Sequence, residues 1–146
     1  MRDNLLIIGA TSVLAHETAR IFAQNNASFA LIARNAEKLH MVAEDLRQKG
    51  AHKILEIVMN VNEVDRHAQT LERAVSALGG LDIAFIAHGS ASDQRSYEQN
   101  LDLLREDIQT NFVSTVSLLM VLAGFFEKQR KGTIAVISSV AGDRGR

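Results

Sequence analysis

Two residues that directly follow short apolar runs could contact a phosphate-bearing ligand. Gly9 follows the apolar residues 5–8, and Arg34 follows residues 29–33. A glycine at such a turn lets backbone amides and a helix N-terminus approach a pyrophosphate, because it carries no side chain. A cation after the second run favours a ribose 2′-phosphate, whereas a bare ribose favours an acidic residue, and Ala33 holds that place. This pattern predicts NADP(H) rather than NAD(H); the alternatives are an ordinary turn and a solvent-exposed arginine.

The elements that must position these residues form a regular alternation. Apolar runs of strand length alternate with segments of helical period, which is typical of a parallel sheet covered by helices. Right-handed crossovers would give an α/β, Rossmann-type doubly wound sheet in the order 3-2-1-4-5, with its ligand crevice at the carboxyl ends of strands 1 and 4. The five predicted strands comprise residues 5–8, 29–33, 54–58, 83–87 and 134–137.

The predicted helices have clear apolar stripes and end signals. One lies between the N-cap Asn35 and the stop residue Gly50, and a second ends at Gly79. A third, over residues 103–127, is apolar over a wide arc, so we expect it to be buried on more than one side. The polar residues 90–100 are predicted to form a surface loop.

Composition limits the classes of function. The 146 residues fit a single domain, 1–146, and the net charge of -1 gives no reason to expect a nucleic-acid partner. The apolar start at residues 5–8 is too short for a signal-peptide core, so we expect a cytoplasmic protein without membrane insertion. The chain has no cysteine, and its five histidines lack metal-ligand spacing, so no metal is expected.

The segments that follow the predicted strands resemble the short-chain dehydrogenase/reductase family over nearly the whole chain. Gly9 matches the first glycine of the family's Gly-x-x-x-Gly-x-Gly, while Val13 and Ala15 replace the other two. After the fourth strand only Gly89 is retained from the family's Asn-Asn-Ala-Gly. The resemblance implies cofactor contacts from Gly9, Thr11, Ser12, Leu14, Arg34, Asn60, Val61, Ala87, His88 and Gly89. For Asn60 the alternative is a loop residue, and for His88 a hydrogen-bonded structural residue.

Two further residues match the family's catalytic positions. Asn111 matches the helix-borne asparagine that reaches the active-site lysine through a water, and Ser139 matches the serine that binds the substrate carbonyl. An asparagine within an apolar arc needs a hydrogen-bond partner, which favours the functional interpretation over a merely structural one. For Ser139 the alternative is a strand-end hydroxyl.

The family's Tyr-x-x-x-Lys pair is expected soon after Ser139, but the sequence ends at Arg146 before any such pair. We therefore expect a truncated family member that lacks the carboxyl-terminal strands and helices. The only tyrosine, Tyr97, lies in the expected loop and has Leu101 where the motif needs lysine.

By resemblance, the intact protein would transfer hydride between NADP(H) and a small-molecule carbonyl or alcohol, and this chain alone would be inactive. The family also forms homo-oligomers through the helix at 103–127. The alternative is a non-catalytic nucleotide-binding protein or a relative in fold only. Residues 9–12, 87–89 and 138–144 further resemble a divergent bacterial subgroup near the reductase partner of decaprenylphosphoryl-ribose epimerase.

Overall fold

The computed structural model describes residues 2–144, so residues 1, 145 and 146 of the expected domain lie outside the described residues. Its centre is a parallel sheet of five strands in the order β3-β2-β1-β4-β5. This order confirms the predicted Rossmann-type topology, and every predicted strand boundary lies within one residue of the observed one. The strands are β1 (Asn4–Ile8), β2 (Ser28–Ala33), β3 (Lys53–Val58), β4 (Ile83–Ile86) and β5 (Thr133–Val136).

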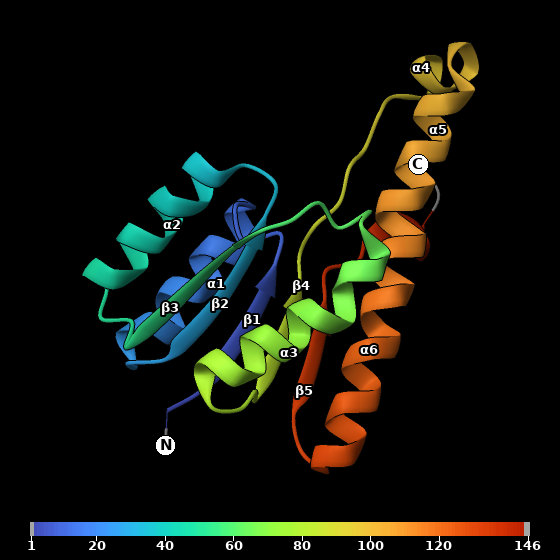
Figure 1. The fold of residues 1–146 in the computed structure, drawn as a ribbon. Coiled ribbons are helices and arrows are strands. Elements are labelled where there is room, and N and C mark those ends of the chain that lie inside the picture. Colours follow the sequence, from blue (N-terminus) through green and yellow to red (C-terminus); the bar gives the residue numbers. More distant parts are fainter. Residues whose placement is uncertain (1, 145–146) are drawn as a thin grey trace.

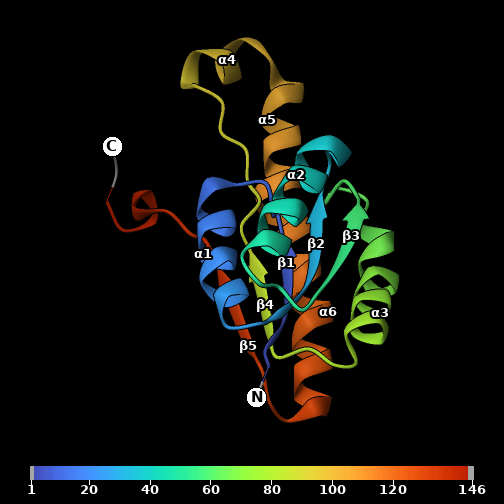
Figure 2. The same ribbon diagram turned by 90° about the vertical axis from the view of Figure 1, so that its left-hand side faces the viewer.

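Helices cover both faces of the sheet (Figures 1 and 2). The alternation of side chains along a strand explains how β1 serves both layers. Leu5 and Ile7 join the core beneath α1 and α2, whereas Leu6 and Ile8 join the core beneath α3 and α6. The four covering helices are α1 (Val13–Gln24), α2 (Ala36–Gln48), α3 (His67–Leu78) and α6 (Ser114–Gln129).

Local signals in the sequence set the ends of these helices. The Ser12 hydroxyl caps α1 by accepting from the Ala15 amide at 3.2 Å. Asn35 caps α2 by accepting from the Lys38 amide at 2.8 Å, as expected. Gly79 ends α3 in the left-handed conformation, with φ at 78°.

The expectation of a loop over residues 90–100 is wrong for its second half. A short helix, α4 (Gln94–Gln99), begins at Asp93, whose carboxylate accepts from the Ser96 amide at 3.1 Å. Tyr97 is therefore a helical residue. A local cap is sufficient to order a polar segment in which no apolar stripe indicates a helix.

The long predicted helix is one continuous helical run, Leu101–Gln129, composed of α5 (Leu101–Ile108), a π-turn η2 (Gln109–Val113) and α6. The expectation that it is buried on more than one side is wrong. Leu118 and Leu122 are buried against the sheet, but Phe112 is 66% exposed and Met120 is 72% exposed. The sheet covers one side of α6, and α5 extends beyond the edge where the strands end (Figure 1).

By length and composition alone this run could also span a membrane. One such helix is weak evidence, because the core helix of a soluble protein meets the same criteria. Here Leu118, Leu122 and Phe126 pack into the sheet's core, so the carboxyl-terminal half of the run has a structural use within the fold.

Candidate functional site

The turn after β1 is packed directly against the segment that follows β4. Gly9 has φ at 82°, and its amide and that of Ala10 both donate to the Ile32 carbonyl, at 2.9 and 3.0 Å. A Cβ placed on Gly9 would lie 2.5 Å from the His88 nitrogen and 2.7 Å from the His88 Cα. The glycine is therefore required by its backbone conformation and by its contact with the segment that follows β4, in addition to any need to approach a ligand.

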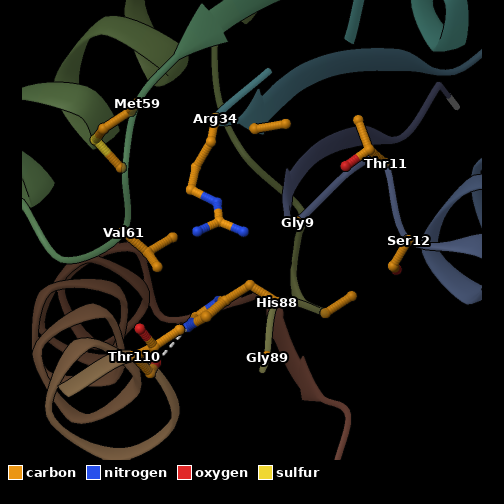
Figure 3. A pocket seen from close by; sticks show the side chains of 11 residues that line it. Gly9, Thr11, Ser12, Arg34, Met59, Val61, His88, Gly89 and Thr110 are labelled. Atoms are coloured by element: carbon orange, nitrogen blue, oxygen red, sulfur yellow. Dashed lines mark hydrogen bonds between the residues drawn. The ribbon is translucent and has the colours of Figure 1, made fainter. Parts of the chain in front are cut away.

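A cavity of about 240 Å³ lies at the carboxyl ends of β1, β2 and β4, and we call it the first cavity. The side chain of Arg34 points into it from the end of β2 (Figure 3). The structure thus brings together eight of the ten residues expected to contact a cofactor. The full lining is Gly9, Thr11, Ser12, Ala33, Arg34, Met59, Val61, Ala87, His88, Gly89 and Thr110.

Two of the expected cofactor residues, Leu14 and Asn60, lie outside this lining. Leu14 is the second residue of α1 and is exposed. The side-chain oxygen of Asn60 accepts from the Asn62 amide at 3.1 Å, which closes a local turn. Cofactor contacts from these two residues stay predictions.

Two lining residues were not anticipated from the sequence. Met59 is the buried residue that follows β3, and Thr110 lies on the π-turn of the long helix. Met59 continues the apolar run of β3, so extending that run by one residue would have indicated it. Nothing local marks Thr110, because it reaches the cavity only through the packing of the helix beside β4.

A second cavity, of about 600 Å³, lies on the other side of the segment that follows β4. It contains both residues expected to be catalytic, Asn111 and Ser139. Ala87, His88 and Gly89 line both cavities and so form a shared wall. The second cavity is lined by Ile86, Ala87, His88, Gly89, Ser90, Asn111, Thr115, Val136, Ile137, Ser138 and Ser139.

Asn111 has a hydrogen-bond partner, as expected, and that partner is the backbone of Ser90. The side-chain nitrogen of Asn111 donates to the Ser90 carbonyl at 2.7 Å, and its side-chain oxygen accepts from the Ser90 amide at 2.8 Å. Asn111 is itself exposed, so the expected burial within an apolar arc is wrong. The pair of bonds fixes the amide against the segment that follows β4.

His88 is half-buried and is held against the long helix by hydrogen bonds. Its Nε2 lies 2.8 Å from the Ser114 hydroxyl and 3.1 Å from the Thr110 carbonyl, while its buried Nδ1 has no hydrogen-bond partner among the described residues. Burial lowers the pKa of His88, the nearby His67 lowers it further, and the Thr110 carbonyl partly opposes the shift. The imidazole is therefore neutral at pH 7.

Tyr97 is bound away from both cavities as far as the described residues show. Its hydroxyl donates to Asp107 Oδ2 at 2.5 Å. Asp107 is buried and also accepts from the Ser90 hydroxyl and, at 3.2 Å, from the Ser92 amide. The hydrogen bonds from Ser90 and Tyr97 lower the pKa of the Asp107 carboxyl. The cluster fixes the segment between β4 and α5 rather than presenting a phenol to a ligand.

The part of the chain that the structure describes contains no group of three or more His, Cys, Asp or Glu residues that could hold a metal ion. The site's chemistry in these residues consists of one guanidinium, a neutral imidazole, hydroxyls and amides.

Comparison with known proteins places this arrangement in a family. The family model for short chain dehydrogenase matches residues 3–146. An uncharacterized oxidoreductase of Mycobacterium tuberculosis is 32% identical over 142 residues, which cover 97% of this chain and 57% of the relative. Dehydrogenase/reductase SDR family member 7 of Mus musculus is 27% identical over 139 residues, covering 93% of this chain and 41% of that protein.

Solved structures show the same fold. A short-chain type dehydrogenase/reductase from Mycobacterium marinum superposes with a TM-score of 0.89 at 26% identity, covering 99% of this chain and 58% of the other. NAD+-bound xylitol dehydrogenase gives a TM-score of 0.89 at 22% identity, covering 99% and 55%. The chain thus spans about half the length of these proteins. The finer similarity to the epimerase-partner subgroup stays a prediction. On the match to the family model and the shared fold, the chain belongs to the short-chain dehydrogenase family.

Proposed function

We propose that this protein binds NADP(H) in the first cavity and that the whole protein transfers hydride between the nicotinamide and a small-molecule carbonyl or alcohol. The observation that carries the choice of cofactor is the Arg34 side chain within a lining that, among the described residues, contains no carboxylate. Structural neighbours include an NAD+-bound xylitol dehydrogenase and an actinorhodin ketoreductase with NADPH. The preference must therefore come from this chain's own residues.

The residues of the first cavity fit a dinucleotide. Thr11 and Ser12 lie at the N-terminus of α1, whose first turn carries no acidic residue, and a helix start of this kind favours an anionic diphosphate. Arg34 would bind the 2′-phosphate through charge-assisted hydrogen bonds. When bound, the cofactor supplies or accepts the hydride.

The residues of the second cavity fit the reacting end. Ser139 would hydrogen-bond the substrate oxygen, and Asn111, fixed by Ser90, would serve a proton relay. The only tyrosine in the sequence, Tyr97, is bound to Asp107 instead. These 146 residues therefore supply no tyrosine acid/base to the second cavity, and such assistance is typically worth about 10² to 10⁴-fold in rate.

A binding titration combined with an activity assay tests the proposal. We expect the 146-residue protein to bind NADPH saturably, followed by nicotinamide fluorescence, and to bind NADH more weakly. We expect no measurable oxidation or reduction across a panel of sugars, steroids and simple ketones. Absence of saturable binding to both cofactors would refute the nucleotide site, and clear turnover would refute the assigned residue roles.

We further propose a cytoplasmic homo-oligomer that uses the exposed side of the long helix. Ile108, Phe112, Val116 and Met120 recur every four residues and are all exposed, so they form one apolar stripe. Exposed apolar patches of this kind mark protein or membrane contacts. The packing of the same run into the sheet through Leu118 and Leu122 favours a protein partner over a lipid one.

A further inference from the structure

The π-turn in the long helix leaves one carbonyl without its usual donor. In an α-helix the amide of Ser114 would donate to the carbonyl of Thr110, four residues back. Here that amide donates to Gln109, five residues back. The Thr110 carbonyl must therefore be satisfied by groups outside the regular helical pattern, and such single π-turns occur often at functional sites.

Two side chains supply the missing donors. The Ser114 hydroxyl donates to the Thr110 carbonyl at 2.6 Å, and His88 Nε2 lies 3.1 Å from the same oxygen. Nε2 also lies 2.8 Å from the Ser114 hydroxyl oxygen. The Thr115 hydroxyl, 3.3 Å from Nε2, can accept or donate. The Thr110 carbonyl can only accept, and the hydrogen of Ser114 is already directed to that carbonyl, so these two neighbours require a donor on Nε2. The geometry therefore places the imidazole proton on Nε2.

The surroundings of the other ring nitrogen, Nδ1, also favour a proton on Nε2. Nδ1 of His88 is buried and has no partner among the described residues. A proton on Nδ1 would create a buried donor without an acceptor, which is costlier than leaving its lone pair unused. A neutral ring with the proton on Nε2 is the form that these surroundings favour.

The histidine is also connected to Asn111 through the segment that follows β4. Asn111 directly follows Thr110, and its amide forms two hydrogen bonds with the backbone of Ser90, at 2.7 and 2.8 Å. The segment from His88 to Ser90 is thus attached to the π-turn at both of its ends. Since His88 and Gly89 line both cavities, this attachment sets the wall between them.

We propose that His88 is a positioning residue: as a neutral imidazole donating from Nε2, it stabilises the π-turn at Thr110 and thereby fixes Asn111 and the wall between the two cavities. The family pattern that the sequence resembles carries alanine at this position, which has no side-chain donor. The inference rests on the proposed function only for the use of Asn111. The geometry at Thr110 can be tested without any ligand.

The first measurement needs no substitution. In ¹⁵N-labelled protein at pH 7, two-bond correlations of the imidazole protons should show His88 as a neutral ring protonated at Nε2, with the signal assigned by its absence in His88→Gln. A ring protonated at Nδ1, or on both nitrogens, would overturn the proposal.

Substitutions then test the positioning. His88→Gln keeps an N–H donor close to the place of Nε2, whereas His88→Leu keeps apolar volume without a donor. We expect His88→Leu to accelerate hydrogen exchange of the amides at 111–115 by about tenfold and to shift the side-chain amide signals of Asn111 toward solvent values. His88→Gln should restore most of the protection. His40→Gln, at an exposed histidine on α2, is the control and should leave these signals unchanged.

Equal exchange in wild type, His88→Leu and His88→Gln would overturn the positioning role, as would equal acceleration in both His88 variants. Titration with NADPH separates this result from the proposed function. Wild-type protein that shows the Nε2 proton and the protected π-turn but fails to bind NADPH would contradict the nucleotide site while supporting the role of His88.

Discussion

The two halves of the sheet, the one around β2 and the one around β5, position their candidate site residues by different means. Every residue of β2 is buried, and Gly9 and Arg34 directly follow strands that are covered by helices on both faces. Within residues 2–144, β5 pairs only with β4, its residues are half-buried or exposed, and Ser139 follows it on the surface. Asn111, also exposed, is fixed by hydrogen bonds to the Ser90 backbone. Core packing positions the first cavity, whereas individual hydrogen bonds position much of the second.

The largest effect should come from Gly9→Ala, because it would disturb the packed side of the sheet. The new Cβ would combine an unfavourable left-handed φ with a contact of 2.5 Å to the His88 backbone. We expect the free energy of unfolding to fall by about 3 kcal/mol, measured by urea denaturation. Gly79→Ala is the matched control: its φ is 78° but nothing lies within 4 Å, so it should cost about 1 kcal/mol. Equal losses would show that the contact with the segment that follows β4 is unimportant.

Removing the cation of the first cavity should affect the ligand rather than the fold. Arg34 is exposed at the end of β2, and a charge-assisted hydrogen bond is worth about 1.5 to 3 kcal/mol. We therefore expect Arg34→Ala to weaken NADPH binding by at least about tenfold in a fluorescence titration, with NADH nearly unchanged and the unfolding midpoint unaltered. Arg47→Ala, on the far end of α2, should leave both affinities as they are. The same loss for both cofactors would contradict recognition of the 2′-phosphate.

Stability should decrease moderately as the pH falls below about 6.5, the value for an unperturbed histidine. Burial lowers the pKa of His67 and of His88 in the folded protein. The unfolded chain therefore takes up protons at a higher pH than the folded one, so the free energy of unfolding is greatest above this value and declines as the pH falls through it. Urea denaturation at pH 7.5, 6.5 and 5.5 measures the decline, and His67→Gln should reduce it.

The carboxyl groups do not obscure this test. Hydrogen bonds lower the pKa of Glu63, Asp93 and Asp107. The stability that these carboxylates contribute is therefore lost only as the pH falls below the ordinary carboxyl pKa of about 4. Stability that rises between pH 7.5 and 5.5 would contradict the burial of the two neutral imidazoles.

The smallest effect on stability should come from the exposed stripe of the long helix. The double substitution Phe112→Ser and Met120→Ser removes apolar groups that are 66% and 72% exposed. We expect the free energy of unfolding to change by only about 0.5 kcal/mol, while self-association measured by analytical ultracentrifugation decreases. Leu122→Ala, on the buried side of the same helix, should instead cost about 2 to 5 kcal/mol. A wild-type protein that stays monomeric at high concentration would contradict the proposed oligomer.

Much of the framework could be predicted from the sequence because its signals are local. The apolar runs placed all five strands, and the positions of Asn35 and Gly79 placed two helix ends, since a cap interacts with residues only a few positions away. Alternation of strands and helices, with right-handed crossovers, then left one strand order to expect. The grouping of Gly9 and Arg34 at one edge of the sheet follows from that order.

The remaining features depend on contacts between distant segments. Gly9 packs on the His88 backbone, the Asn111 amide pairs with Ser90, and the Thr110 carbonyl is bound by His88. No period or cap in the sequence encodes these pairs, because each joins residues twenty or more positions apart. The burial predicted for the long helix on more than one side is wrong for the same reason. Composition fixes which side chains are apolar, but only the position of the sheet decides which of them it covers. Sequence therefore determined the strands, the caps and the edge that carries the site, and tertiary packing decided how the two cavities share a wall.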